Sequence, residues 1–120
     1  MNHVKIDKAE EAPDVVLGIL PVNSFPAKVL FDTGASHSFV SKTFATTNNL
    51  IVVPLSNQIT VHSPGSQMLT SKISKDNQIL IGGHIFLVSL MLLGSSDIDV
   101  ILGMDWLKAN KARIDCAQNQ

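Results

Sequence analysis

One acidic residue, Asp32, stands where a buried strand is expected to end. The apolar run Val29–Phe31 precedes it, and Gly34 follows where the chain needs a sharp bend and a close backbone approach. Thr33 and Ser36 place hydroxyls beside the carboxylate, and hydroxyl donors stabilise an ionised carboxyl. Such a carboxyl can act as a general acid or base in hydrolysis. Taken alone, however, the pattern is more typical of an ordinary turn or a helix cap, because Asp and Gly are common turn residues.

A second element near the C-terminus changes that interpretation. Residues 100–107 read Val-Ile-Leu-Gly-Met-Asp-Trp-Leu, and residues 31–36 read Phe-Asp-Thr-Gly-Ala-Ser. The order and separation of these two motifs resemble the retropepsin branch of the aspartic proteases. The segment FDTGASHSFVS followed by DVILGMDWL is most similar to the protease domain of gypsy-type LTR retrotransposon polyproteins. The resemblance covers the chain from Asp14 to Cys116.

The resemblance implies a role for each part of the two motifs. Asp32 would be the catalytic acid and base. The active-site loop would consist of Thr33, Gly34, Ala35 and Ser36. The loop would be supported from its opposite side by Ile101, Leu102 and Gly103. A hairpin flap would close over bound peptide, with its tip at Ser63, Pro64, Gly65 and Ser66. No metal ion or other cofactor is implied.

A single catalytic motif predicts a homodimer. Peptide hydrolysis without a metal needs one group to deprotonate water and another to protonate the leaving amine. Two carboxyls that share a proton do both, because close carboxylates cannot both stay ionised, as the aspartic proteases themselves illustrate. Asp32 is the only aspartate followed by Thr-Gly or Ser-Gly. We therefore expect the second carboxyl to be Asp32 of another copy, across a two-fold axis.

The C-terminal end bears on the strength of this dimer. Relatives usually continue into a further strand that helps to hold the dimer, whereas four residues follow Cys116 here. We expect weaker dimerisation for that reason.

Other residues that could do chemistry have less specific patterns. The four histidines and Cys116 lack metal-ligand spacing, so a zinc site is not favoured. The histidines are His3, His37, His62 and His84. Asp105 either hydrogen-bonds near the active-site loop or complements a helix N-terminus. Trp106 is predicted to fill the core, and Asp97 and Asp99 are predicted to be loop acids.

The composition excludes several classes of function. A net charge of −1 gives no electrostatic surface for nucleic acid, and no apolar run reaches the ~20 residues that span a bilayer. The N-terminus lacks the pattern of a signal peptide. We expect no nucleic-acid or membrane partner, and a location in the cytoplasm or in virus-like particles within it.

Short apolar segments at close spacing predict an all-β fold, a small closed acid-protease barrel with one or two short helices. Residues 1–13 are predicted to be a flexible lead-in, and residues 14–120 a single protease domain. Predicted strands cover residues 14–20, 27–31, 50–53, 58–61, 67–73, 78–81, 84–93, 99–102 and 112–116. Predicted helices cover residues 38–49, with Ser38 as cap, and residues 104–110. Gly82 and Gly83 predict a two-residue hairpin turn.

The predicted function is an aspartic endopeptidase that processes an extended peptide or a Gag-Pol-type polyprotein. Two alternatives stay open. A non-catalytic pepsin-fold module for dimerisation or peptide binding would share the fold, although the intact Asp-Thr-Gly argues against it. A host-adapted protease of a ubiquitin-linked type would share the chemistry.

Overall fold

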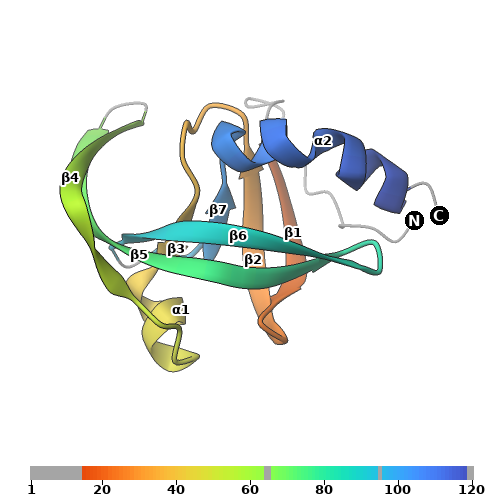
Figure 1. Cartoon of the computed structure of the whole chain (residues 1–120), viewed down its shortest axis with the longest axis horizontal. Coiled ribbons are helices and arrows are strands. Elements are labelled where there is room, and N and C mark those ends of the chain that lie inside the picture. Colours follow the sequence, from red (N-terminus) through yellow and green to blue (C-terminus); the bar gives the residue numbers. More distant parts are fainter. Residues whose placement is uncertain (1–14, 64–65, 95, 119–120) are drawn as a thin grey trace.

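The computed structural model describes residues 15–63, 66–94 and 96–118, so the predicted lead-in lies outside the described residues (Figure 1). These described residues form seven strands and two helices, and six of the strands close into a barrel, which confirms the predicted fold class. In chain order the elements are β1 (Val15–Val22), β2 (Phe25–Asp32), β3 (Phe39–Ser41), α1 (Lys42–Thr47), β4 (Val53–Ser63), β5 (Ser66–Ile81), β6 (His84–Leu93), β7 (Val100–Leu102) and α2 (Met104–Gln118).

Six strands close the barrel. The sheet order is β1-β2-β7-β3-β6-β5-β4, and a further antiparallel pairing of Val22 with Ile79 joins β1 to β5. The side chain of Asn23 reinforces this closure, because its Oδ1 accepts a hydrogen bond of 2.8 Å from the backbone N–H of Gln78. β4 pairs only with β5 in the sheet order and therefore lies outside the closed ring.

Two tight turns set the register of the first and third hairpins. Gly82 and Gly83 both adopt positive φ, 57° and 82°, as a two-residue turn between β5 and β6 requires. Asn23 and Ser24 do the same between β1 and β2, with φ of 51° and 72°. These two residues suffice for the turn, so both strands are longer than predicted.

The barrel interior is filled by alternate residues of each strand. On β6, Phe86, Val88 and Leu90 are buried, whereas Ile85 and Leu87 are exposed. α2 packs on this core through Trp106, as predicted; its side chain is 6% exposed. The Trp106 ring meets that of Phe86 edge to face at 5.6 Å, and its Nε1 donates to the Leu87 carbonyl at 3.1 Å.

The helix predicted over residues 38–49 is wrong in its first part. Residues 39–41 form β3 instead, because this segment pairs with β6 on one side and β7 on the other. The helix begins at Lys42, and its cap is Ser41 rather than Ser38. The Ser41 hydroxyl accepts a hydrogen bond of 3.1 Å from the backbone N–H of Phe44. The pairing on both edges therefore determines the conformation of this segment, although the spacing of its apolar residues is helical.

The last predicted strand, residues 112–116, is also wrong, because α2 continues through it to Gln118. No Gly or Pro follows Met104 to end the helix, and the sequence there is rich in helix-forming Ala, Lys and Arg. The strands predicted at residues 67–73 and 78–81 form one strand, β5. An irregularity between Ser74 and Asn77, with Asp76 at a φ of 58°, interrupts its pairing with β6.

Asp99 lies just before β7, where a loop acid was predicted, but it has a structural role. Its carboxylate accepts a hydrogen bond of 2.8 Å from the backbone N–H of Lys28 on β2. Its own backbone N–H donates to the Lys28 carbonyl at 2.9 Å. These bonds hold the start of β7 against β2, the strand that carries Asp32.

Candidate active site

Asp32 is the last residue of β2, where it pairs with Val15 of β1. Successive side chains of a strand point to opposite faces, so Asp32 shares a face with Leu30 and not with the core residues Val29 and Phe31. The aspartate is half-buried. The strand therefore delivers a carboxyl to the outer surface at one end of the barrel.

The loop that follows wraps around this carboxyl. The backbone N–H of Gly34 donates to Asp32 Oδ1 at 2.8 Å, and that of Ala35 donates to the Asp32 carbonyl at 3.2 Å. Gly34 does not adopt positive φ, so it is needed for space rather than for a left-handed bend. A Cβ at this position would stand 3.2 Å from Asp32 Oδ1. The backbone amide can approach the carboxylate this closely because the side chain is absent.

β7 supports the loop from beneath. It lies between β2 and β3, with Ile101 paired to Leu30 on one side and to Phe39 on the other. The chain between β2 and β3 must therefore pass over the end of β7, where Gly103 lies. A Cβ on Gly103 would overlap the carbonyl oxygen of His37 and stand 2.7 Å from that of Ala35. Only glycine fits this contact, which places Gly103 directly against the loop, while Ile101 and Leu102 precede it on β7.

A buried hydroxyl ties the end of the loop to the start of α2. Ser38, 1% exposed, accepts a hydrogen bond of 3.0 Å from the Gly103 backbone N–H and donates one of 2.7 Å to Asp105 Oδ1. The same Asp105 oxygen accepts from the backbone N–H of Trp106. Asp105 therefore combines the two roles proposed for it, because it bonds the loop and stands in the first turn of α2. The Met104 N–H adds a bond of 2.7 Å to the Ala35 carbonyl.

The outer surface of the loop faces solvent. Thr33, Gly34 and Ser36 are exposed, and the Ser36 hydroxyl lies 2.9 Å from His37 Nδ1. The His37 ring is half-buried rather than fully at the surface. The loop is thus fixed from below by β7 and α2 and is open above, where a second chain or a substrate could approach.

An apolar row lies next to Asp32 on the same outer face. Register places Leu30 of β2, Ile101 of β7, Phe39 of β3 and Met91 of β6 side by side across four strands. Phe39 is buried, yet it lies outside the main core cluster. The other three members of the row, Leu30, Ile101 and Met91, are half-buried. Leu30, Phe39 and Met91 were not predicted as site residues; the alternation of apolar residues along β2 and β6 is the signal that could have identified them.

The predicted flap corresponds to the hairpin of β4 and β5, which projects from the barrel in Figure 1. Ser63 and Ser66 are register partners at the ends of these strands. Pro64 and Gly65, the other two predicted flap residues, lie outside the described residues.

No cation site accompanies these residues in the described ranges, where no three His, Cys, Asp or Glu residues are grouped as metal ligands would be. Neither described helix is long and apolar enough to cross a membrane.

Comparisons with known proteins agree with the barrel fold. A sequence model described as retroviral aspartyl protease matches residues 1–120. No curated protein matches the chain. Among solved structures, EIAV protease complexed with the inhibitor HBY-793 is similar, with 20% identity, a TM-score of 0.62, and coverage of 79% of this chain and 86% of that chain. The retroviral protease-like domain of Ddi1 from Leishmania major has 17% identity and a TM-score of 0.58, with coverage of 79% and 76%. At these identities the structural matches establish the fold alone.

Proposed function

Because the chain belongs to the retroviral aspartyl protease family, we propose that it is an aspartic endopeptidase whose active site forms across a homodimer. One observation carries this proposal. Asp32 stands at the end of β2 in the only Asp-Thr-Gly of the chain, with its Oδ1 held at 2.8 Å by the Gly34 N–H. One carboxyl cannot serve as base and acid at once in peptide hydrolysis, so a second copy contributes its own Asp32.

The proposed dimer explains why the loop is fixed below and open above. In a two-fold arrangement the exposed Thr33 and Gly34 of both chains would meet at the axis. A water molecule held between the two carboxyls would attack the peptide carbonyl. One Asp32 would take the water proton, and the other would polarise the carbonyl oxygen and then protonate the leaving amine. The substrate cleft would be completed by the apolar row of each protomer.

The proposed substrate is an extended segment of a Gag-Pol-type polyprotein from a gypsy-type LTR retrotransposon. The likeness of residues 31–41 and 99–107 to that group supports this choice. The row formed by Leu30, Phe39, Met91 and Ile101 favours apolar residues beside the cleaved bond. Processing would take place in the cytoplasm or in virus-like particles assembled there.

A second candidate keeps the chemistry and changes the substrate. Similarity to the retroviral protease-like domain of Ddi1 from Leishmania major favours a host-adapted protease that acts on cellular proteins. Cleavage of polyprotein junction peptides supports the first candidate. Cleavage of cellular proteins without cleavage of such peptides supports the second.

The proposed activity is tested with the purified chain and peptides that carry two apolar residues at the central bond. Asp32→Asn should lower the rate by more than about a thousandfold, because both proton-transfer roles fail together. Asp97→Asn is the matched control, since Asp97 is exposed and lies outside the site. An Asp32→Asn rate within about tenfold of the wild-type rate would contradict the catalytic role. A chain that binds pepstatin and cleaves nothing would instead be a binding module.

A further inference from the structure

Asp99, which directly precedes β7, bonds both backbone groups of Lys28 on β2. The Lys28 N–H donates to Asp99 Oδ2 at 2.8 Å, and the Lys28 carbonyl accepts from the Asp99 N–H at 2.9 Å. In a regular parallel ladder the N–H and the C=O of one residue bond to two different residues of the neighbouring strand. Here the Asp99 side chain takes the place of a backbone acceptor, so both groups of Lys28 depend on one residue. Only one alignment of the two strands allows both bonds.

The side chains of β7 do not by themselves fix its alignment with β2. The strand has three residues, Val100–Leu102, and lies between β2 and β3. A slip of one residue along β2 would turn the fully buried Val100 and Leu102 outward, and the loss of burial opposes it. A slip of two residues keeps each side chain on its own face, since the side-chain period of a strand is two. The two Asp99–Lys28 bonds exclude both slips.

The alignment of β7 decides which residue lies beneath the active-site loop. Continued by one residue, the register of β2 and β7 places Gly103 opposite Asp32. A Cβ on Gly103 would overlap the carbonyl oxygen of His37, so the loop accepts only glycine there. A slip of two residues would bring Ile101 or Asp105 to this position, and both carry a Cβ. The slipped strand would therefore displace the loop that follows the candidate catalytic carboxyl.

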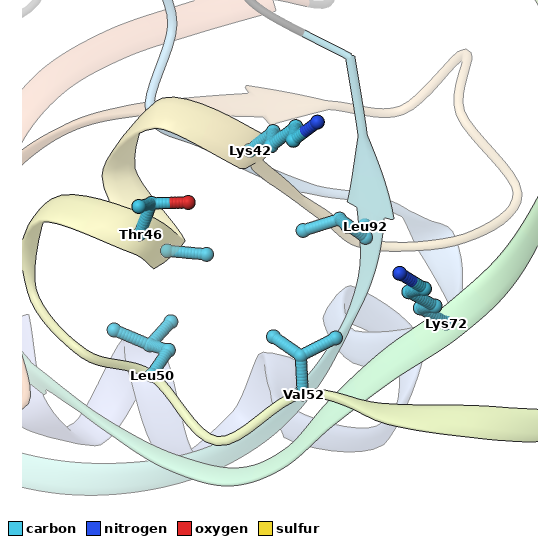
Figure 2. Close-up of a pocket in the computed structure, with 7 residues that line it drawn as sticks. Lys42, Thr46, Leu50, Val52, Lys72 and Leu92 are labelled. Carbon is cyan, nitrogen blue, oxygen red and sulfur yellow. The ribbon is translucent and has the colours of Figure 1, made fainter.

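A third bond joins Asp99 to β3. The Ser41 N–H donates to the Asp99 carbonyl at 2.9 Å, and Ser41 is the cap of α1. Beside α1 lies a pocket of about 320 Å³, with Lys42 of the helix and Val52 of the segment before β4 among its lining residues (Figure 2). Close packing is therefore missing on that side of α1, and the bond to Asp99 is one of those that hold its first turn in place. Asp99 thus joins β2, β7 and β3, the three strands around the loop.

We propose that Asp99 is a positioning residue for Asp32, because it sets the alignment of β7 with β2 and so keeps Gly103 beneath the active-site loop. Lys28, to which Asp99 bonds, stands four residues before Asp32, about 13 Å away along β2. The effect passes through the alignment of the strands and not through contact with substrate. Its catalytic consequence rests on the proposed function, whereas the alignment itself does not.

Substitutions at Asp99 separate the geometry of its bonds from its charge. Asp99→Asn removes the charge but keeps an oxygen acceptor at the same distance, so it should behave like the wild type. Asp99→Glu keeps the charge but moves the carboxylate outward by one methylene, so it should behave like Asp99→Ala, which has no acceptor. A purely electrostatic role predicts the opposite order, and that order would overturn the proposal. The control is Asp97→Ala, because Asp97 is exposed and lies in the same loop.

The alignment is measured by amide hydrogen exchange of the full chain, followed by nuclear magnetic resonance. Gly103 and Met104 are the reporters, because their N–H groups bond the Ser38 hydroxyl and the Ala35 carbonyl. In Asp99→Ala and Asp99→Glu these two amides should exchange at least about tenfold faster relative to the amides of β5 and β6. Asp99→Asn and the control should stay within about threefold of the wild type.

Referring each rate to β5 and β6 of the same variant removes the effect of a general loss of stability. Equal acceleration of every amide would show such a general loss alone and would overturn the proposal. Unchanged rates of Gly103 and Met104 in Asp99→Glu would overturn it as well. The contrast between Asp99→Glu and Asp99→Asn carries the test even where Asp99→Ala does not fold.

Kinetics give a second measurement under conditions in which the variants are folded. Asp99→Glu should lower kcat at least about tenfold and change KM by less than about threefold, since the carboxyl is displaced while most of the apolar row stays in place. Asp99→Asn should keep the wild-type kcat. A change in KM alone would overturn the positioning role. If the wild type cleaves no peptide, the proposed function fails, and the exchange rates alone decide whether Asp99 sets the alignment.

Discussion

The bonds made by Ser38 give a quantitative test of how the active-site loop is held. In Ser38→Ala the Gly103 N–H loses its acceptor in a buried position, which costs about 1–3 kcal/mol of the free energy of unfolding. Loss of the 2.7 Å bond to Asp105 adds about 1 kcal/mol. This is less than is usual for a hydrogen bond to a charged group, because the Asp105 carboxylate is exposed and screened by solvent. The substitution should therefore destabilise the protein by about 2–4 kcal/mol.

The measurement is a urea titration followed by the fluorescence of Trp106, the only tryptophan of the chain. Ser89→Ala is the matched control, because Ser89 is exposed on β6 and should change the free energy of unfolding by less than about 0.5 kcal/mol. A double-mutant cycle with Asp105→Asn should show coupling between positions 38 and 105. A loss below about 0.5 kcal/mol for Ser38→Ala, or additive effects in the cycle, would refute this account of the loop.

Two further substitutions test the platform beneath the loop. Trp106→Ala should lower the free energy of unfolding by about 3–5 kcal/mol, because it empties a buried site and removes the ring contact with Phe86. The measurement is a denaturant melt followed by circular dichroism, and a loss below about 1 kcal/mol would contradict that packing. Gly103→Ala should lower peptidase activity by more than about a hundredfold, since its Cβ would displace the loop that follows Asp32 and donates to its carboxylate. Gly94→Ala is the control, because a Cβ at that position has open space. Equal activity of the two variants would show that the loop can accommodate a Cβ at position 103.

The active-site loop and its support were predicted from two short motifs that resemble those of the aspartic proteases, and each motif is contiguous in the sequence. Asp32 ends β2 and Gly103 directly follows β7, where a Cβ would overlap the carbonyl oxygen of His37. The bounds of β6 were predicted correctly, because ten apolar-rich residues follow a Gly-Gly turn. Trp106 was predicted to lie in the core because it stands beside Leu107 and at helical spacing from Asn110.

The missed features depend on pairing between distant segments. Residues 39–41 have helical spacing of apolar side chains, yet they pair with β6 and β7, which lie about 50 to 60 residues away in the chain. The apolar row beside Asp32 exists only through the register of four strands, so no single motif contains it. The role of Asp99 likewise depends on β2 lying beside β7.

The central claim is that two chains form one active site, and dilution kinetics with sedimentation test it most directly. If each protomer supplies one Asp32, specific activity should fall on dilution, and below the dimer dissociation constant the rate should rise with the square of protein concentration. An excess of the Asp32→Asn chain should suppress the wild type, because mixed dimers would pair one carboxyl with one amide. A monomer by sedimentation whose specific activity stays constant on dilution, and which the Asp32→Asn chain does not inhibit, would contradict the shared site.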